Sequence, residues 1–422
     1  MSPTKSASVN PASETLVLRG HVVDSGVLGR VLDDILDLGG DYSIETLDLG
    51  RTADDESMVR IIVQAPDIER LAMILARVQL HGANLADPGE ARLVAADIAG
   101  ALPVDFYSTT NLATSVRVGG AWLPVANPEM DCAVMVSIGP SASTARTSPM
   151  SDVAVGDLVV CGNAGVRVEL PHSPVDTGST FEFMNSGVSS ERPQTLQVRQ
   201  IAEAMRATKA RGEKVLWVVG PAVVHTGAAP ALAALVNAGW VDCLFAGNAV
   251  AAHDIESVMF GTSLGVDLSQ GSGVEHGHEN HIRAINWVRR AGSISAAVEQ
   301  GLISGGLMHA LVTAGKPFVL VGSVRDDGPL PEVITDVIEG QQAMRAQLPG
   351  VGYAIMVATM LHSIATGNIL PGSVPLVCVD INPATVTKLS DRGSSQAQGV
   401  VTDVGLFLHT LTADLVPGWQ QG

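Results

Sequence analysis

The chain has 422 residues, of which 46% are hydrophobic and 16% are charged, and its formal net charge is -18. This length predicts two to three domains, at about 100–200 residues each, and the apolar content is enough for each to bury a core. Disorder over most of the chain is excluded, because disordered segments combine low hydrophobicity with net charge. We expect no nucleic-acid partner, because phosphate binding needs a basic face and the largest basic cluster is Arg289-Arg290.

Two uncharged stretches, residues 215–241 and 348–379, have the length of membrane spans. Both are interrupted by glycine, proline and polar residues, whereas a lipid-exposed helix needs about 20 continuous apolar residues. We therefore expect no membrane span. Residues 1–13 have no apolar segment typical of a signal peptide and are predicted to be a disordered tail, so we expect a cytoplasmic protein.

Residues 14–84 are predicted to form a small α+β subdomain. A strand at 15–23 is followed by a helix that Ser25 would cap, with apolar residues three and four apart between positions 27 and 35. Strands at 42–49 and 58–64 follow, and Pro66 and Asp67 begin a second helix that extends to Leu80. This β-α-β-β-α order is that of a ferredoxin-like (or ACT-like) amino-acid-sensing module.

Residues 85–192 are predicted to form a mostly β subdomain that ends in a Ser-, Gly- and Pro-rich linker at 172–192. Short β-type runs occur at 114–118, 132–138, 158–160 and 166–170. The chain's four cysteines lie singly in apolar runs, with no CxxC pair, which is typical of inert core thiols.

Residues 193–422 alternate between strand and helix patterns, which predicts a parallel sheet with helices on both faces. The five apolar strands are 215–219, 241–246, 318–321, 354–357 and 376–379. Each leads directly into a polar cluster. Because ligands of open α/β sheets bind beyond the carboxyl ends of the strands, we expect these five clusters to meet at one ligand-binding edge.

A dinucleotide suits this edge. Asp380 ends an apolar strand, where a carboxylate can accept hydrogen bonds from a ribose, and Asn382-Pro383 is a good helix start. The chain has no G-x-G-x-x-G motif, so a pyrophosphate would need other backbone amides, for example those of residues 360–362 at a helix start. The alternative is that the clusters are only turn and cap chemistry.

A second polar cluster, residues 275–281, holds three histidines, and Arg283 follows it. Only His278 and His281 have the i, i+3 spacing of metal ligands on a helix, so we favour a substrate-facing loop in which Arg283 binds a carboxylate. A solvated loop remains the alternative. His253-Asp254 can serve either in proton transfer or in capping and packing. Asp336 is predicted to cap a helix that extends to Leu348.

Several motifs together resemble the family that contains a lysine-oxoglutarate reductase/saccharopine dehydrogenase (LOR/SDH) domain, with archaeal-type ornithine cyclodeaminases among its members. The resemblance covers residues 14–412, nearly the whole chain. The segments that carry it are 15–26, 107–111, 220–227, 246–249, 325–331, 358–363, 379–383 and 401–405.

The resemblance implies a Rossmann-like NAD-binding domain and conversion of L-ornithine to L-proline and ammonia with recycled NAD. In this reaction the Cα hydride passes to NAD, the δ-amine attacks the resulting imine, ammonia leaves, and the hydride returns to the cyclic imine. By matching motifs, the implied NAD contacts are Asn248, Ala249, Asp327, Thr359, Met360, Leu361, His362, Asp380, Asp403 and Val404. Arginine is not an expected substrate, because nothing here corresponds to the arginine-hydrolysing domain of the fused cyanobacterial relatives.

For the chemistry itself we expect His253 or Asp254 to transfer protons, Arg283 to bind the substrate carboxylate, and Asn111 and Asp131 to bind an amine. The segments 161–165 and 276–281 are less typical of the family, so a different amino acid is an alternative substrate. Two other functions stay open, namely a net amino-acid or imine oxidoreductase and a non-catalytic NAD- or amino-acid-sensing module. We expect a homo-oligomer and no bound metal.

Overall fold

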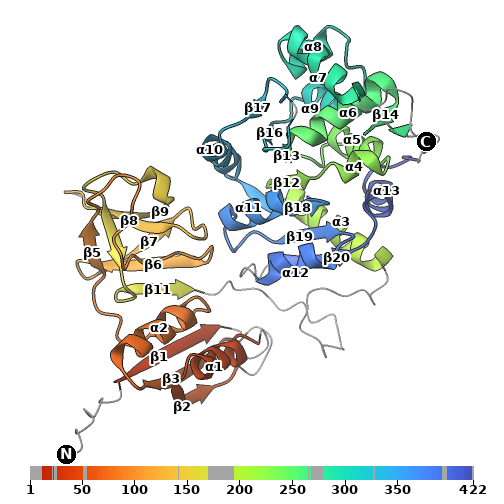
Figure 1. The fold of residues 1–422 in the computed structure, drawn as a ribbon. Helices are drawn as coiled ribbons and strands as arrows, with labels where there is room; N and C mark the ends of the chain where they lie inside the picture. The colour runs from red at the N-terminus through yellow and green to blue at the C-terminus, as the bar shows by residue number, and fades with distance from the viewer. Residues whose placement is uncertain are drawn as a thin grey trace, which may run out of the picture. The chain divides into compact units, whose positions relative to one another are not determined.

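The structure is a computed structural model with two compact units, which are described separately here (Figure 1). Unit 1 comprises residues 1–185 and 371–373, and unit 2 comprises residues 186–370 and 374–422. The structure describes residues 12–20, 22, 26–50, 55–140, 142–169, 194–264, 266–267, 279–326, 328–391 and 397–420.

Unit 1 begins with a four-stranded antiparallel sheet and two helices. The elements are β1 (Ala12–Gly20), α1 (Val27–Asp37), β2 (Asp41–Asp48), β3 (Ser57–Ala65), α2 (Ile68–Gln79) and β4 (Asn84–Leu85). The strand order β2-β3-β1-β4 is that of a ferredoxin-like fold, as predicted. Leu16, Leu18 and Ile61 of the sheet pack with Val31 and Ile74 of the helices in one core. Both helices therefore lie on one face of the sheet, and the other face, which carries no helix among the described residues, is called the helix-free face below.

The helix starts show why these segments fold as they do. Asp67 caps α2 by accepting a hydrogen bond from the Arg70 N–H at 2.7 Å, as its position predicted. Ser25, the predicted cap of α1, lies outside the described residues. Gly26 occupies the N-cap position of α1, so the residue at this position offers no side chain for a capping hydrogen bond.

The rest of unit 1 is a β subdomain, as predicted. Its strands form one sheet in the order β11-β6-β7-β9-β8-β10-β5. They are β5 (Arg92–Ala95), β6 (Ala113–Val118), β7 (Ala121–Ala126), β8 (Ala133–Ser137), β9 (Thr144–Ser148), β10 (Leu158–Cys161) and β11 (Val166–Glu169), with a short 3-10 helix at Met150–Asp152. The predicted linker, residues 172–192, lies outside the described residues.

Unit 2 is built on a seven-stranded parallel sheet in the order β17-β16-β13-β12-β18-β19-β20. The strands are β12 (Lys214–Val219), β13 (Cys243–Gly247), β16 (Phe318–Val321), β17 (Val333–Ile334), β18 (Val351–Val357), β19 (Leu376–Asp380) and β20 (Ala397–Val401). From β16 to β20 this is the doubly wound order 3-2-1-4-5-6. The chain therefore reverses direction across the sheet between β12 and β18, which is the switch point where such folds bind ligands.

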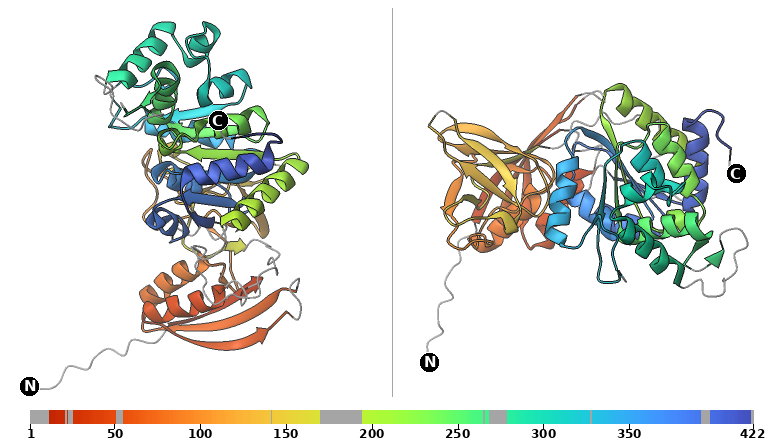
Figure 2. Two further views of the ribbon diagram at one scale, coloured as in Figure 1. Left: turned by 90° about the vertical axis from the view of Figure 1, so that its right-hand side faces the viewer. Right: turned by 90° about the horizontal axis from the view of Figure 1, so that it is seen from above.

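Helices cover both faces of this sheet (Figure 2). Alternation along β12 places Trp217 in one core and Leu216 and Val218 in the other. The helices are α3 (Gln194–Ala210), α4 (Ala222–His225), α5 (Ala229–Asn237), α6 (Asn248–Phe260), α7 (Asn280–Ala291), α8 (Ile294–Glu299), α9 (Gly306–Thr313), α10 (Val337–Gln347), α11 (Leu361–Ile369), α12 (Pro383–Asp391) and α13 (Val404–Leu415), with a small hairpin of β14 (Thr262–Ser263) and β15 (Val266–Asp267) after α6.

Several local predictions are confirmed in unit 2. Asp336 caps α10 through the N–H groups of Ile338 and Glu339, and Asn382 caps α12 by accepting from the Ala384 N–H at 3.0 Å. All four cysteines are buried, and none forms a disulfide bond with another described residue. Within the described residues, no helix is long and apolar enough to cross a membrane.

Candidate functional site

The two strands at the switch point come unusually close where they end. Gly220, directly after β12, donates its N–H to the carbonyl of Val357 at 2.8 Å. A Cβ atom at Gly220 would lie 1.8 Å from the carbonyl oxygen of Ala358, so only glycine fits. Ala358 itself has a φ of 52°, a left-handed conformation that is uncommon outside glycine. The backbone is therefore held in one particular arrangement at the position where a doubly wound sheet binds its ligand.

Two helices begin at this carboxyl edge without a side-chain cap. They are α6, after β13, and α11, after β18. Leu361, in the first turn of α11, is 78% exposed. His362, the next residue, lies against Gly247 at the start of α6, where a Cβ atom would be 3.3 Å from its ring. Uncapped helix starts attract anions, because their N–H groups and the helix dipole both favour negative charge.

His362 is the titratable group at this junction. Burial lowers its pKa below the ordinary value, and the nearby carboxylate of Asp326 only partly opposes that shift. The imidazole is therefore neutral near pH 7 and offers one donor and one acceptor beside the two helix starts. Thr359 and Met360, which precede it, are half-buried at the end of β18.

Two aspartates follow the neighbouring strands. Asp380, the last residue of β19, is 9% exposed, and its Oδ1 accepts the N–H of Asn382 at 2.8 Å. Asp403, after β20, caps α13 with its Oδ1, which accepts the Leu406 N–H at 2.9 Å. In both carboxylates the second oxygen has no hydrogen-bond partner among the described residues. Each aspartate can therefore accept a ligand hydroxyl without giving up its structural bond. Val404, the first residue of α13, is buried.

Asn248, the first residue of α6, connects this helix to another segment of unit 2, which its place in the sequence did not predict. Its side chain is 4% exposed, and Oδ1 accepts the Leu330 N–H at 3.0 Å, which ties α6 to the chain after β16. Ala249 follows it and is half-buried. Asp327, the third predicted cofactor contact in this region, lies outside the described residues.

A buried acid–imidazole pair lies further along α6. Glu256 is completely buried, and its Oε2 lies 2.8 Å from Nδ1 of His253, one turn earlier. The Thr262 hydroxyl donates to Oε1 at 2.8 Å, and the amide of Asn280 donates to that hydroxyl at 2.8 Å. The Leu264 N–H also reaches Oε2 at 3.3 Å. The carboxylate is thus held at both oxygens, which fixes the orientation of the His253 ring.

Two further histidines surround His253. The His225 ring lies edge-on to it, with 4.9 Å between ring centroids, and His225 Nδ1 contacts the Ser263 hydroxyl at 2.7 Å. Burial, followed by the neighbouring His253, lowers the pKa of His225. The ring centroid of His281 is 6.0 Å from that of His253. The structure therefore gathers one imidazole from each of α4, α6 and α7.

Asp254, adjacent to His253, points elsewhere. It is 0% exposed, and its two oxygens accept the N–H groups of Leu307 and Met308, at 2.9 and 2.8 Å, at the start of α9. Burial raises its pKa to about 6 even though these two hydrogen bonds act in the opposite direction. The geometry is that of a helix cap supplied from a distant helix.

Arg283 is not brought together with the imidazoles. Its side chain is 60% exposed and pairs with Glu279 along α7. It borders a shallow hollow with Ile282 and Asn286. Two positions after His281, it projects about 200° around the helix from that ring. His276 and His278 lie outside the described residues, and no metal-binding group of His, Cys, Asp and Glu occurs among those that are described.

Asn111 and Asp131 lie in unit 1, where Thr109 connects their segments. The Thr109 hydroxyl donates to the Glu129 carbonyl at 2.6 Å, and the Thr109 carbonyl accepts the Asp131 N–H at 3.1 Å. Asp131 is exposed, with a φ of 60°. Asn111 is 1% exposed, and neither atom of its amide has a hydrogen-bond partner among the described residues. Buried polar atoms normally have partners, so an unsatisfied amide is a sign of a missing ligand or water.

Family models match almost the whole chain. Residues 13–112 match the LOR/SDH bifunctional enzyme conserved region, residues 113–198 the first region of the C-terminal part of ArgZ-like arginine dihydrolases, and residues 199–411 the Rossmann fold of that part. The chain is 51% identical over 398 residues to the ornithine cyclodeaminase of Methanothermobacter thermautotrophicus, with 94% of this chain and 96% of that protein covered.

The chain belongs to the LOR/SDH family of ornithine cyclodeaminases.

Two solved structures of this family are similar to the chain. The crystal structure of apo ArgZ, a cyanobacterial arginine dihydrolase, is 37% identical with a TM-score of 0.85, and the match covers 98% of this chain and 60% of that one. The ternary complex of AgrE with ornithine and NAD+ is 41% identical with a TM-score of 0.52, and the match covers 97% and 58%. AgrE itself is the bifunctional arginine dihydrolase/ornithine cyclodeaminase of Nostoc sp..

The residues at the carboxyl edge fit NAD, the cofactor that the family resemblance implies. The start of α11, which no side chain caps, offers N–H groups of the kind that bind a pyrophosphate. Asp380 offers an unpartnered carboxylate oxygen for a ribose hydroxyl. Gly220 allows the close approach of the Ala358 carbonyl, which fixes the backbone just before Thr359 and Met360.

Sequence reasoning missed two parts of the site in this LOR/SDH-family chain. Glu256 lies one turn after His253, and the i, i+3 spacing was the available signal, but a helical glutamate is usually solvent-exposed. Gly220 was assigned only to a polar cluster, because its closeness to Ala358 depends on the strand order.

Proposed function

We propose that this protein is an NAD-dependent ornithine cyclodeaminase that converts L-ornithine to L-proline and ammonia. The observation that carries the proposal is identity of 44–51% over nearly the full length to five archaeal proteins named ornithine cyclodeaminase. The AgrE complex with ornithine and NAD+ supports the cofactor. When bound, NAD supplies the hydride acceptor and donor, and the protein supplies orientation and proton transfer.

We propose that His253 is the group that transfers protons. Its Nδ1 is directed to Glu256, so Nε2 is the nitrogen that can take a proton from the substrate amine. Glu256 fixes the tautomer and stabilises the protonated ring, and Thr262 holds Glu256 in place. The neighbouring residue Asp254 already uses both oxygens to cap α9, so we assign it a structural role in this mechanism.

The substrate contacts of Asn111, Asp131 and Arg283 are also proposals. Asn111 is the best supported, because both atoms of its buried amide lack partners among the described residues. Asp131 lies in the adjacent turn and provides an exposed carboxylate for an ammonium group. Arg283 pairs with Glu279 through Nη2 and can bind a carboxylate with its other N–H groups. A homo-oligomeric state and a cytoplasmic location also stay predictions from the sequence.

One assay tests the function. The purified protein is incubated with L-ornithine, with and without added NAD, and proline, ammonia and the absorbance of reduced cofactor are followed. Proline and ammonia in equal amounts without net NADH support the proposal. Stoichiometric NADH would indicate a net oxidoreductase instead, and binding without turnover across basic amino acids would indicate a sensor.

Glu256→Gln tests the proton-transfer arrangement. An amide in this place turns an N–H group either toward His253 Nδ1 and the Leu264 N–H or toward the Thr262 hydroxyl, and in both orientations it carries no negative charge beside the His253 ring. We expect kcat to fall by about 10²–10⁴ with little change in NAD affinity. Glu299→Gln, on the exposed end of α8, is the matched control and should retain full activity. Unchanged kcat in Glu256→Gln would remove His253 from the mechanism.

A further inference from the structure

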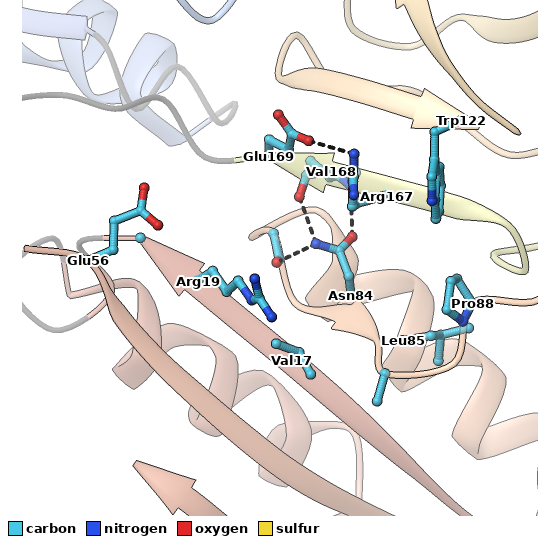
Figure 3. Close-up of a pocket in the computed structure, with 13 residues that line it drawn as sticks. Val17, Arg19, Glu56, Asn84, Leu85, Pro88, Trp122, Arg167, Val168 and Glu169 are labelled. Carbon is cyan, nitrogen blue, oxygen red and sulfur yellow. Dashed lines mark hydrogen bonds and ion pairs between the residues drawn. The ribbon is translucent and has the colours of Figure 1, made fainter. Parts of the chain in front are cut away.

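Unit 1 contains a cavity of about 490 Å³ that lies on the helix-free face of the ferredoxin-like sheet (Figure 3). Strand alternation explains which side chains reach it. Leu16 and Leu18 of β1 point into the core under the helices, so Val17 and Arg19 point to the opposite face and line the cavity. The volume is in the range of small-molecule sites, about 300–1,000 Å³.

The far wall of the cavity is β11, and it is fixed to the sheet by two side-chain amides. The Asn84 side chain both donates to the Val168 carbonyl and accepts the Val168 N–H, each at 2.7 Å. Gln79, at the end of α2, donates to the Val166 carbonyl at 3.0 Å. These contacts hold the two walls together, so the cavity does not depend on a ligand to keep its shape.

Two arginines line the cavity, and only one of them forms an ion pair with another described residue. Arg167 lies 4.6 Å over the ring of Trp122 and pairs with Glu169 at 3.1 Å, so its charge is already balanced. Arg19 makes no side-chain hydrogen bond or ion pair with any described residue. A guanidinium that borders a cavity in this way is well suited to a carboxylate, which it can bind through two parallel hydrogen bonds.

An acidic group lies on the same face of the sheet. Arg19 is paired with Met58 in the β1–β3 register, and Glu56 is two positions before Met58. Glu56 directly precedes β3, and it lines the cavity together with Arg19. The floor beside them is apolar and includes Val17 and Leu85. The cavity thus presents a cation, an anion and an apolar surface within the reach of one small molecule.

We propose that this cavity is a second ligand site that binds a zwitterionic amino acid with a compact apolar side chain. The carboxylate binds Arg19, the ammonium binds Glu56, and the side chain packs on Val17 and Leu85. All of these residues belong to unit 1, and none of them is among the residues assigned above to the cofactor or to proton transfer. The proposal does not rest on the proposed function, because amino-acid binding in this cavity can be measured without any catalytic turnover.

The test is titration of the full-length protein with L-proline, in the absence of NAD and ornithine, by calorimetry and tryptophan fluorescence. We expect saturable heat and a fluorescence change from Trp122. Trp122→Phe should abolish most of the fluorescence change. Arg19→Gln should weaken binding at least tenfold, as expected for loss of a charge-assisted hydrogen bond. Arg70→Gln, on the exposed side of α2, is the matched control and should bind like the parent.

Two truncated probes test the ligand class. Pyrrolidine lacks the carboxylate and cyclopentanecarboxylate lacks the ammonium group, so each should bind more weakly than L-proline. Equal binding of L-proline by Arg19→Gln and the parent would overturn the proposal, since binding at the catalytic site would survive this change. Equal binding of pyrrolidine and L-proline would also overturn it, as would no binding of L-proline.

Discussion

Replacement of Gly220 by alanine tests whether the close approach at the switch point shapes the cofactor site. The added Cβ atom would lie 1.8 Å from the Ala358 carbonyl oxygen, whereas real Cβ atoms are not found closer than 3.0 Å to such an atom. One of the two strand ends must therefore move by more than an ångström. Ala358 already has a φ of 52°, so the loop has few other conformations available.

The expected cost of Gly220→Ala has two parts. Overpacking of this kind costs about 1–3 kcal/mol, which corresponds to a fall in Tm of roughly 2–12 °C for a unit of this size. Displacement of the residues before α11 by about 1 Å should raise the Kd for NAD by about 10–100-fold. Thermal unfolding followed by calorimetric titration with NAD measures both quantities on the same sample.

Gly29→Ala is the control for Gly220→Ala. Gly29 lies inside α1 and has nothing within 4 Å of its Cβ position, so alanine should neither lower the Tm nor change the NAD affinity. If Gly220→Ala unfolds at the temperature of the parent and binds NAD equally well, the close contact does not shape the site and the reasoning fails. A lower Tm with unchanged NAD affinity would show that the contact matters only for stability.

Three further changes test individual carboxylates. Asp380→Ala should raise the Kd for NAD about tenfold or more, because a charge-assisted hydrogen bond is lost, and calorimetry that found full affinity would contradict the ribose assignment. Burial raises the pKa of Asp254 to about 6, above its ordinary 3.8, so ionisation of this carboxyl favours the unfolded state and stability is lost as the pH rises through this interval. In denaturant unfolding, the difference in unfolding free energy between the parent and Asp254→Asn should shrink by about 3 kcal/mol from pH 4 to pH 7. A difference that grew over this range would refute the assignment. Although burial alone would raise the pKa of Asp242, its bonds to Lys209 and the Val215 N–H lower it, so the carboxylate stabilises the fold above about pH 4 and this effect is lost in acid. The difference in unfolding free energy between the parent and Asp242→Asn should therefore become smaller below about pH 4. A difference that did not depend on pH would exclude a stabilising ion pair at Asp242.

The sequence predicted those parts of the fold that depend on local patterns. The ends of five parallel strands and the caps at Asp67 and Asp336 all follow from residues within one turn or one strand. Strands β17 and β20 were missed, since β17 has only two residues and β20, with Gly399 at its centre, has no continuous apolar run.

The site was less accessible to prediction, because its decisive contacts join distant residues. Asp254 caps a helix that begins more than 50 positions later, and nothing in the neighbouring sequence reveals that partner. Glu256 became recognisable only through its complete burial and its contact with Thr262. In contrast, Asp380 was found from its position at a strand end, since the sheet topology rather than a specific partner defines its role.

Helix α6 is fastened at three points along its length: Asn248 at its first turn binds the chain after β16, Asp254 in the middle binds α9, and Glu256 near its end binds Thr262. A helix held in this way can neither slide nor rotate without breaking a buried hydrogen bond. His253 is therefore preorganised before any substrate arrives, and its orientation costs no entropy during the reaction. Substitutions that alter substrate preference should accordingly be better tolerated in the surrounding loops than in α6, where most substitutions would destabilise the fold.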